Sequence, residues 1–246
     1  MLNTLDIDLA LQTGINRYSG SLLHGILMEK LDTDYAEELH HNELQPFSQF
    51  LFRDYQKDCY VWRISTLTAE AKENIIQRLL VDNAPEIVLK HNNARINILG
   101  KRLANPLTYQ TLTNQVLAGE SNRRIVLRFL TPTTFKSAGE FVVFPEVRLI
   151  YGSLFRKWNA FATAVSLNDT AAQEHLVRHT KIAGYKLRTV RYAMEGVFIN
   201  AFLGEVCLYV NGPEALSQIA DILFAFVRYT GLGAKTALGM GGIDAE

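Results

Sequence analysis

The sequence predicts an α+β protein in which one βαββαβ unit is followed by a second and by a C-terminal glycine-rich loop. Stretches of alternating polar and apolar residues, typical of half-buried strands, occur in both halves of the chain. Segments with apolar residues three and four positions apart, typical of amphipathic helices, lie between these stretches. Because this order repeats, we expect two units, at residues 1–105 and 121–246, with a short and partly ordered linker around residues 103–122.

The first unit opens with an expected strand and then a helix in which Leu23, Ile26 and Leu27 recur at the spacing of one buried face. Further along, Thr68 precedes Ala-Glu-Ala-Lys, which is typical of a capped helix start with an acidic first turn. The expected elements are a strand at 2–11, a helix at 18–31, a strand pair at 47–52 and 59–64, a helix at 68–80 and a strand or hairpin at 86–99.

The second unit repeats this order. Near its end, Pro213 suits the first turn of a helix whose apolar face contains Leu216, Ile219 and Leu223. The expected elements are a strand at 125–129, a helix at 145–164, strands at 186–192 and 198–209, a helix at 213–229 and a last strand after the glycine-rich loop. Together the two units predict a tandem ferredoxin-like (RRM-like) fold.

Length and composition favour a soluble protein of one or two domains in the cytoplasm. The chain has 246 residues, 48% of them hydrophobic, and no apolar run long enough to cross a membrane. Its N-terminus lacks the basic and then apolar pattern of a signal peptide, so we expect no membrane partner. Cys59 and Cys207 lie in apolar, strand-like runs, which indicates reduced core thiols rather than a disulfide, a metal site or a nucleophile.

The charge of the chain is balanced overall but unevenly distributed. The net charge is zero, which argues against a protein that coats nucleic acids without selectivity. Residues 121–191, however, contain twelve lysines and arginines and only four acidic residues. An asymmetry of this size can give one face an affinity for a polyanion while the whole protein stays neutral.

Residues 231–242, called the terminal loop below, contain five glycines, one lysine and one threonine. Such a backbone can approach a ligand closely and offers N–H groups and a positive charge, which suits phosphate. It is not a Walker loop, because Ala234 stands where that loop needs glycine. It is not a dinucleotide fingerprint either, because Thr236 replaces the third glycine.

The terminal loop follows the end of a predicted helix, with Gly231 as its expected C-cap. We therefore expect loop amides and Lys235, rather than a helix dipole, to hold an anion. The alternative is a flexible glycine-rich tail. Leu232, Leu238 and Met240 argue against that alternative, because linkers seldom contain so many packing residues.

Five segments spread over nearly the whole chain match the motifs of one known family. They are Leu23-His24-Gly25, Leu39-His40 with Pro46-Phe47-Ser48, residues 129–133, residues 153–159 and the terminal loop. On these motifs the chain resembles the CRISPR-associated repeat-RNA endoribonucleases. That family belongs to the repeat-associated mysterious protein (RAMP) superfamily and cuts CRISPR precursor RNA (pre-crRNA) within each repeat.

The resemblance implies a metal-independent endoribonuclease that needs no cofactor. In that family the ribose 2′-OH attacks the adjacent phosphorus and leaves a 2′,3′-cyclic phosphate and a 5′-OH, and mature crRNAs result. The implied partner is CRISPR repeat RNA, single-stranded or hairpin, with a CRISPR effector complex as a further partner and no DNA. Two alternatives stay open: a non-catalytic RNA-binding RAMP subunit of an effector complex, and a small-molecule-binding regulator of ferredoxin-like fold.

Histidines are the candidates for acid–base catalysis, because histidine titrates closest to neutral pH. The resemblance points to His40, which follows Leu39 in an expected loop after the first helix. His41 is its close rival, and His24 on the first helix is more typical of a packed histidine. His175 and His179 stand four residues apart, but no third ligand follows at a convincing spacing, so we expect no metal site there.

Two positions depart from the pattern of the family. Some members have a tyrosine on the first helix and a lysine after the histidine, where this chain has Met28 and Gln45. Other groups must then assist the histidine. The candidates are Tyr35, Lys30, His24 and Lys235.

The residues expected to contact RNA lie in the terminal loop and in the basic stretch. In the loop they are Lys235, Thr236, Gly231, Gly233, Gly239 and Gly241. In the basic stretch they are Arg128, Lys136, Arg156, Lys157, Arg188 and Arg191. Tyr185 and Tyr192 are available to stack on bases.

Overall fold

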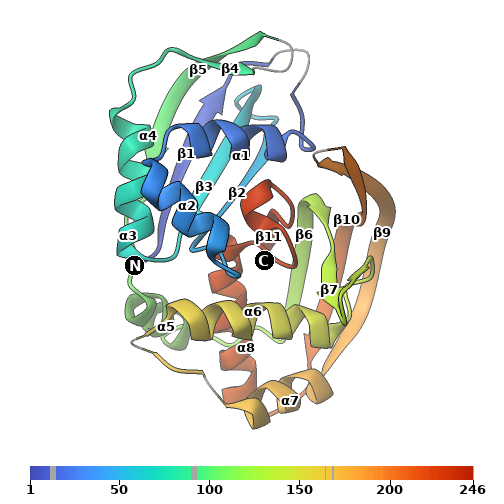
Figure 1. Cartoon of the computed structure of the whole chain (residues 1–246). Coiled ribbons are helices and arrows are strands. Elements are labelled where there is room, and N and C mark those ends of the chain that lie inside the picture. The colour runs from blue at the N-terminus through green and yellow to red at the C-terminus, as the bar shows by residue number, and fades with distance from the viewer. Residues whose placement is uncertain (12–14, 90–92, 164, 168, 195, 246) are drawn as a thin grey trace.

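The structure is a computed structural model that describes residues 1–11, 15–89, 93–163, 165–167, 169–194 and 196–245. It contains two main antiparallel sheets, one in each half of the chain, with helices packed against them (Figure 1). This arrangement confirms the predicted α+β, tandem ferredoxin-like fold. In the described part of the chain, no helix combines the length and the apolar character needed to span a membrane.

The first half contains β1 (Asn3–Leu9), α1 (Gly20–Glu29), α2 (Thr33–His41), β2 (Phe47–Asp54), β3 (Cys59–Thr66), β4 (Glu86–Leu89) and β5 (Ala94–Leu103). A continuous helical segment before β4 consists of α3 (Ala69–Ala71), the π-helix η1 (Lys72–Gln77) and α4 (Arg78–Val81). The strand order is β2-β3-β1-β5-β4, which is the ferredoxin-like order with β4 added at one edge. The predicted strand pair is therefore confirmed, and β4 pairs antiparallel with β5.

Apolar alternation on β1 explains how this first sheet acquires its helices. Leu5, Ile7 and Leu9 are buried, while the residues between them are half-buried, so one face of the strand lies against the core. That face packs with Leu23 and Leu27 of α1 in one apolar cluster. The first sheet is thereby fixed against α1, the helix that precedes the candidate histidines.

The helix α2 stands where the sequence analysis expects a loop. Its buried residues are Tyr35 and Leu39, which lie four positions apart and therefore on one face. Both belong to the apolar cluster of the first sheet. The correction matters for the site, because His40 and His41 occupy the last turn of a helix rather than a loop.

The second half contains β6 (Arg124–Thr133), β7 (Phe135–Ser137), β8 (Glu140–Val142), α6 (Val147–Phe161), α7 (Thr170–His179), β9 (Thr180–Met194), β10 (Val197–Val210), α8 (Glu214–Thr230), the 3-10 helix η2 (Thr236–Leu238) and β11 (Ile243–Ala245). The strand order is β11-β6-β10-β9, again ferredoxin-like. Each element predicted here is present, although the expected end of the long helix at Ala164 lies outside the described residues. The hairpin β7–β8 and the helix α7 are additions that the sequence analysis did not predict.

The linker contains a helix, α5 (Tyr109–Leu117), which packs against α8. The ring of Tyr109 lies 5.4 Å from that of Trp158 on α6 and 5.6 Å from that of Phe226 on α8, measured between ring centroids. The Tyr109 hydroxyl donates a hydrogen bond to the carbonyl of Leu67, in the first half, at 3.0 Å. The linker therefore joins the two cores instead of crossing solvent.

Candidate functional site

The terminal loop is packed between the two halves of the molecule, as its position in red in Figure 1 shows. The helix α8 ends at Thr230, and Gly231 follows with a φ of 60°, as predicted for a C-cap. Leu232 and Met240 are completely buried. The expectation of a packed loop is confirmed against the alternative of a flexible tail, because η2 lies against both β2 and α1 of the first half.

Gln49 of β2 holds the terminal loop from the first half. Its Nε2 atom donates hydrogen bonds to the carbonyls of Gly20 at 2.8 Å and Ala237 at 3.0 Å. Its Oε1 atom accepts a hydrogen bond from Nε1 of Trp62 at 2.8 Å. Because Gln49 is completely buried, these bonds replace those it would make to water, and the position of η2 is fixed relative to the first sheet.

Tyr192 holds the terminal loop from the second half. Its hydroxyl donates a hydrogen bond to the carbonyl of Leu238 at 2.5 Å and accepts one from the N–H of Ser21 on α1 at 2.9 Å. The side chain is completely buried. Tyr192 is therefore a structural link between β9, α1 and η2, and the expectation that it stacks on a base is wrong.

The glycines of the terminal loop are needed where backbone lies against backbone. A Cβ atom on Gly241, whose φ is 69°, would lie 2.1 Å from the carbonyl oxygen of Leu232. A Cβ atom on Gly239 would lie 2.4 Å from the Cα of Gly20. The same close approach to the protein itself is found at Gly231 and Gly233. These glycines therefore permit internal packing, and their contact with RNA stays a prediction.

Several loop amides are also occupied by the protein. The N–H of Gly233 donates to Oγ of Ser153 at 3.1 Å, and that of Ala234 donates to the carbonyl of Thr134 at 2.8 Å. The N–H of Gly241 donates to the carbonyl of Pro132 at 3.0 Å, and that of Gly242 to Oγ1 of Thr131 at 2.8 Å. These four amides are therefore not available to bind an anion.

Lys235 is the residue of the terminal loop that presents a charge to solvent. Its side chain is exposed, and its backbone adopts the left-handed conformation with a φ of 60° at the start of η2. Non-glycine residues adopt this conformation rarely, so it depends on the packing around it. The rigid loop thereby holds one ammonium group at the rim between the two halves.

Lys157 and Thr236 lie beneath that rim. Lys157, on α6, is only 6% exposed, and its Nζ donates hydrogen bonds to the carbonyl of Thr230 at 2.7 Å and to Oγ1 of Thr236 at 2.9 Å. Burial, with a smaller contribution from the charge of Arg156, lowers the pKa of Lys157 to about 7. The sequence analysis expects both residues to contact RNA. Both side chains are instead buried and bonded internally, so neither is available on the surface.

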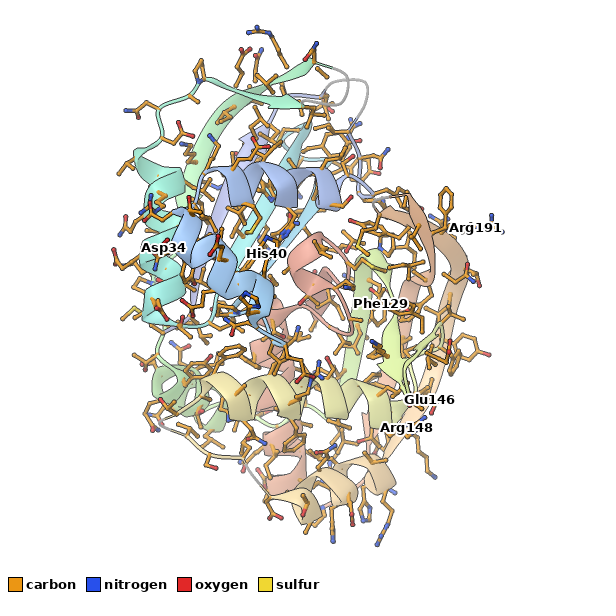
Figure 2. The ribbon with its side chains drawn as sticks, in the orientation of Figure 1. Asp34, His40, Phe129, Glu146, Arg148 and Arg191 are labelled. Carbon is orange, nitrogen blue, oxygen red and sulfur yellow. The ribbon has the colours of Figure 1, made fainter. Side chains whose placement is uncertain are left out.

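The C-terminal end of α2 carries two exposed imidazoles. His40 and His41 are both exposed, and Figure 2 shows His40 between α2 and the terminal loop in that view. Oε1 of Glu43, just beyond this helix, lies 3.4 Å from Nη1 of Arg156 on α6. This ion pair brings the end of α2 next to the helix that supports the terminal loop.

Tyr35, one of the candidates to assist the histidine, and Gln45, which replaces the lysine of the family pattern, both have structural roles. Tyr35 lies on the buried face of α2. Burial raises the pKa of its hydroxyl well above its ordinary value, and the charges of Glu70 and Glu38 add to the shift. It cannot exchange protons with a substrate at the surface. Gln45 donates hydrogen bonds from Nε2 to the carbonyls of Leu39 at 2.6 Å and Asn42 at 3.1 Å, and so caps the end of α2.

The other histidines lie in different surroundings. The ring of His24 is half-buried and stacks on Phe47 with a centroid distance of 6.2 Å, which fits the expected packed histidine. His175 and His179 lie on α7, at the opposite end of the molecule from α1 and α2 (Figure 1). Within the described ranges, no three or more histidine, cysteine or acidic side chains form a group that could hold a metal.

The remaining basic residues are exposed but spread over the second half. Arg156 lies beside the end of α2, and Lys136 lies on β7. Arg188 and Arg191 lie on β9, and Figure 2 shows Arg191 on the far side of the molecule from His40. Nε of Arg128 pairs with Oε2 of Glu205 at 3.1 Å. The structure therefore brings Arg156 to the histidines but leaves β9 as a separate basic edge.

Comparison with known proteins places this fold and sequence together in one family. The sequence model described as "CRISPR-associated endoribonuclease Cas6" matches residues 127–243. A Cas6 endoribonuclease from Streptococcus thermophilus is 31% identical, over 91% of this chain and 89% of that protein. A Cas6 endoribonuclease from Mycobacterium tuberculosis is 27% identical, over 99% of this chain and 76% of that protein.

A solved structure has the same fold. It is described as a Cas6 product complex, superposes with a TM-score of 0.81 at 24% identity, and covers 100% of this chain and 99% of its own. The fold thus agrees with the family that the sequences indicate. On the strength of the relative with 31% identity over most of its length, this chain belongs to the CRISPR-associated endoribonuclease Cas6 family.

Proposed function

We propose that this protein cleaves CRISPR precursor RNA within its repeats, in the cytoplasm, and so releases mature crRNAs. Membership of the Cas6 endoribonuclease family is the observation that carries this proposal. The exposed imidazoles at the end of α2, and a packed loop that holds one lysine at the surface, support it. An RNA strand between the two halves would pass both features.

The proposed reaction is an internal transesterification, which an imidazole and two cationic side chains can catalyse. An imidazole at the end of α2 takes the proton of the ribose 2′-OH, and the 2′ oxygen attacks the adjacent phosphorus. The bond from phosphorus to the 5′ oxygen breaks, and that oxygen takes up a proton, which leaves a 2′,3′-cyclic phosphate and a 5′-OH. The charges of Lys235 and Arg156 would stabilise the negative phosphoryl oxygens.

His40 is the proposed acid–base residue, with His41 as its rival. Neighbouring residues on a helix point about 100° apart, since 3.6 residues complete one turn. One of these two imidazoles can therefore face a bound phosphate while the other points away from it. The resemblance of Leu39-His40 to the family motif favours His40.

The experiment that tests this function uses purified protein, EDTA and labelled repeat RNA copied from the CRISPR array of the same genome. We expect one cut within the repeat and a product that ends in a 2′,3′-cyclic phosphate. The same RNA with a 2′-deoxy group at the scissile nucleotide should bind and stay intact, because the nucleophile is missing. Cutting of the 2′-deoxy RNA would contradict the mechanism.

The alternative is a non-catalytic RNA-binding subunit of an effector complex. It is less well supported, because the relatives that match the chain are named as endoribonucleases. In the same experiment this alternative predicts binding of both RNAs and cleavage of neither. Failure to bind either RNA would contradict both functions.

A further inference from the structure

A group of exposed apolar side chains lies on the second half, away from the candidate histidines. Tyr185 on β9 is 64% exposed, and Phe144, before α6, is 40% exposed. Their ring centroids are 5.6 Å apart and the ring planes meet at 87°, so the edge of one ring is held against the face of the other. Phe141 and Val143, shortly before Phe144 in the sequence, are also exposed. We call these four residues the aromatic surface.

Lysines and arginines lie on the strands that carry or adjoin the aromatic surface. Lys136 on β7 is the cross-strand partner of Phe141 on β8, so the two side chains share one face of that hairpin. The strand that carries Tyr185 contains four lysines and arginines over residues 180–194 and no acidic residue. Lys186 and Arg188 alternate with Tyr185 along β9 and therefore lie on the other face of this edge strand. Two carboxylates near the aromatic surface have cationic partners, since Glu146 pairs with Arg148 at 2.8 Å and Glu205 with Arg128 at 3.1 Å, whereas Glu140, next to Phe141 on β8, is exposed.

The aromatic surface is joined to the terminal loop by a short series of contacts. The N–H of Ala234, next to Lys235, donates to the carbonyl of Thr134 at 2.8 Å. Oγ1 of Thr134 donates in turn to the carbonyl of Val142 at 3.1 Å, two residues before Phe144. A strand that has one phosphate at Lys235 can therefore continue along the hairpin β7–β8 toward Tyr185.

We propose that Tyr185 and Phe144 form a stacking platform for an unpaired base of the bound RNA, outside the point of cleavage. This inference rests on the proposed function, because it assigns a second contact to the same RNA. Exposed aromatic rings beside a cationic strand combine the two features with which proteins bind single-stranded nucleic acid. An apolar protein partner would use the rings alone, whereas a nucleotide can use the rings together with the lysines and arginines of β7 and β9.

The test measures binding of the full-length protein to repeat RNA that carries a 2′-deoxy group at the scissile nucleotide. The fluorescent base 2-aminopurine replaces one unpaired nucleotide at a time, because its emission falls when it stacks. For Tyr185→Ala we expect an affinity loss of about 5- to 150-fold and restored emission at one position. Tyr185→Phe keeps the ring and should behave as the wild type.

Tyr55→Ala is the matched control, because Tyr55 is 77% exposed on the first half of the chain, far along the sequence from the terminal loop. It should leave affinity and emission unchanged. Phe144→Leu provides a second variant that keeps apolar volume and removes the ring, and it should restore emission at the same nucleotide as Tyr185→Ala.

Two results separate this inference from the proposed function. If the wild type cuts repeat RNA but Tyr185→Ala binds and quenches like the wild type, the stacking platform is overturned and the nuclease stands. If the wild type neither binds nor cuts repeat RNA, the proposed function itself fails, and the platform fails with it.

Discussion

The end of α2 and the terminal loop belong to opposite halves of the molecule, and they are held in contrasting ways. The imidazoles of His40 and His41 are exposed on the last turn of a helix that buries only two residues. The terminal loop is fixed by Gln49 and Tyr192 and by buried apolar residues. In the proposed mechanism, the exposed helix end transfers the proton and the packed loop positions the RNA.

Lys235 and Lys157 show the same contrast between an exposed and a buried position. Lys235 and Lys157 both stand in motifs that the sequence analysis marks for RNA contact. Lys235 is exposed, whereas Lys157 is buried and bonded to Thr230 and Thr236. One presents a charge, and the other supports the backbone that presents it.

Loss of the imidazole should give the largest effect. His40→Ala should lower the single-turnover cleavage rate by about 10²- to 10⁴-fold, because a general acid–base group is removed. Affinity for the 2′-deoxy repeat RNA should stay within a factor of two or so, because the side chain transfers a proton rather than anchoring the strand. His41→Ala is the matched control and should cut at nearly the wild-type rate. The reverse result would assign the role to His41.

A change in the terminal loop should instead affect stability and binding together. In Gly241→Ala the new Cβ would lie 2.1 Å from the carbonyl oxygen of Leu232, at a backbone conformation that alanine disfavours. We expect the free energy of unfolding to fall by about 3 kcal/mol or more, measured by urea denaturation, and RNA affinity to fall with it.

Gly25→Ala is the control for that change. Nothing lies within 4 Å of a Cβ at Gly25, which is inside α1, so alanine should leave stability unchanged or raise it by up to about 1 kcal/mol. Equal behaviour of the two variants would show that the loop is not held as the contacts indicate.

Most strands and helices, and the packed terminal loop, could be predicted from the sequence, because apolar residues recur in it at the spacing of strands and helices. Leu232 and Met240 correctly indicated a packed loop. The helix α2 was missed, because only Tyr35 and Leu39 mark its buried face and the rest of the segment is polar.

The burial of Lys157 and of Tyr192 was also missed, although the sequence pattern indicates it. Lys157 shares a helix face with Ile150 and Leu154, at the spacing i, i+4 and i+7, which predicts burial. Tyr192 occupies the buried position in the alternation of β9, next to exposed Arg191. The hydrogen bonds that make these burials favourable depend on tertiary contacts with Thr236 and Leu238, which no local pattern contains.

The buried lysine should give a pH dependence of stability. Its pKa is about 7 in the folded protein and near 10.5 in the unfolded chain, so between these values the unfolded chain binds the additional proton. The free energy of unfolding of the wild type, relative to Lys157→Met, should therefore rise from pH 7 to 10, by at most about 1.4 kcal/mol per pH unit. Urea denaturation of both proteins across this range measures it, and a flat difference would contradict the buried position of the ammonium.

The exposed lysine should give the smallest effect, and one without a stability component. Lys235→Ala removes one surface charge that makes no contact needed for the fold, so the unfolding midpoint should not change. If Lys235 contacts a phosphate, the slope of log affinity against log salt concentration should become shallower by about 1, with weaker binding at low salt. Lys57→Ala, an exposed lysine of the first half, should leave the slope unchanged. An unchanged slope in Lys235→Ala would mean that the rigid loop positions its backbone for another purpose than presenting this charge.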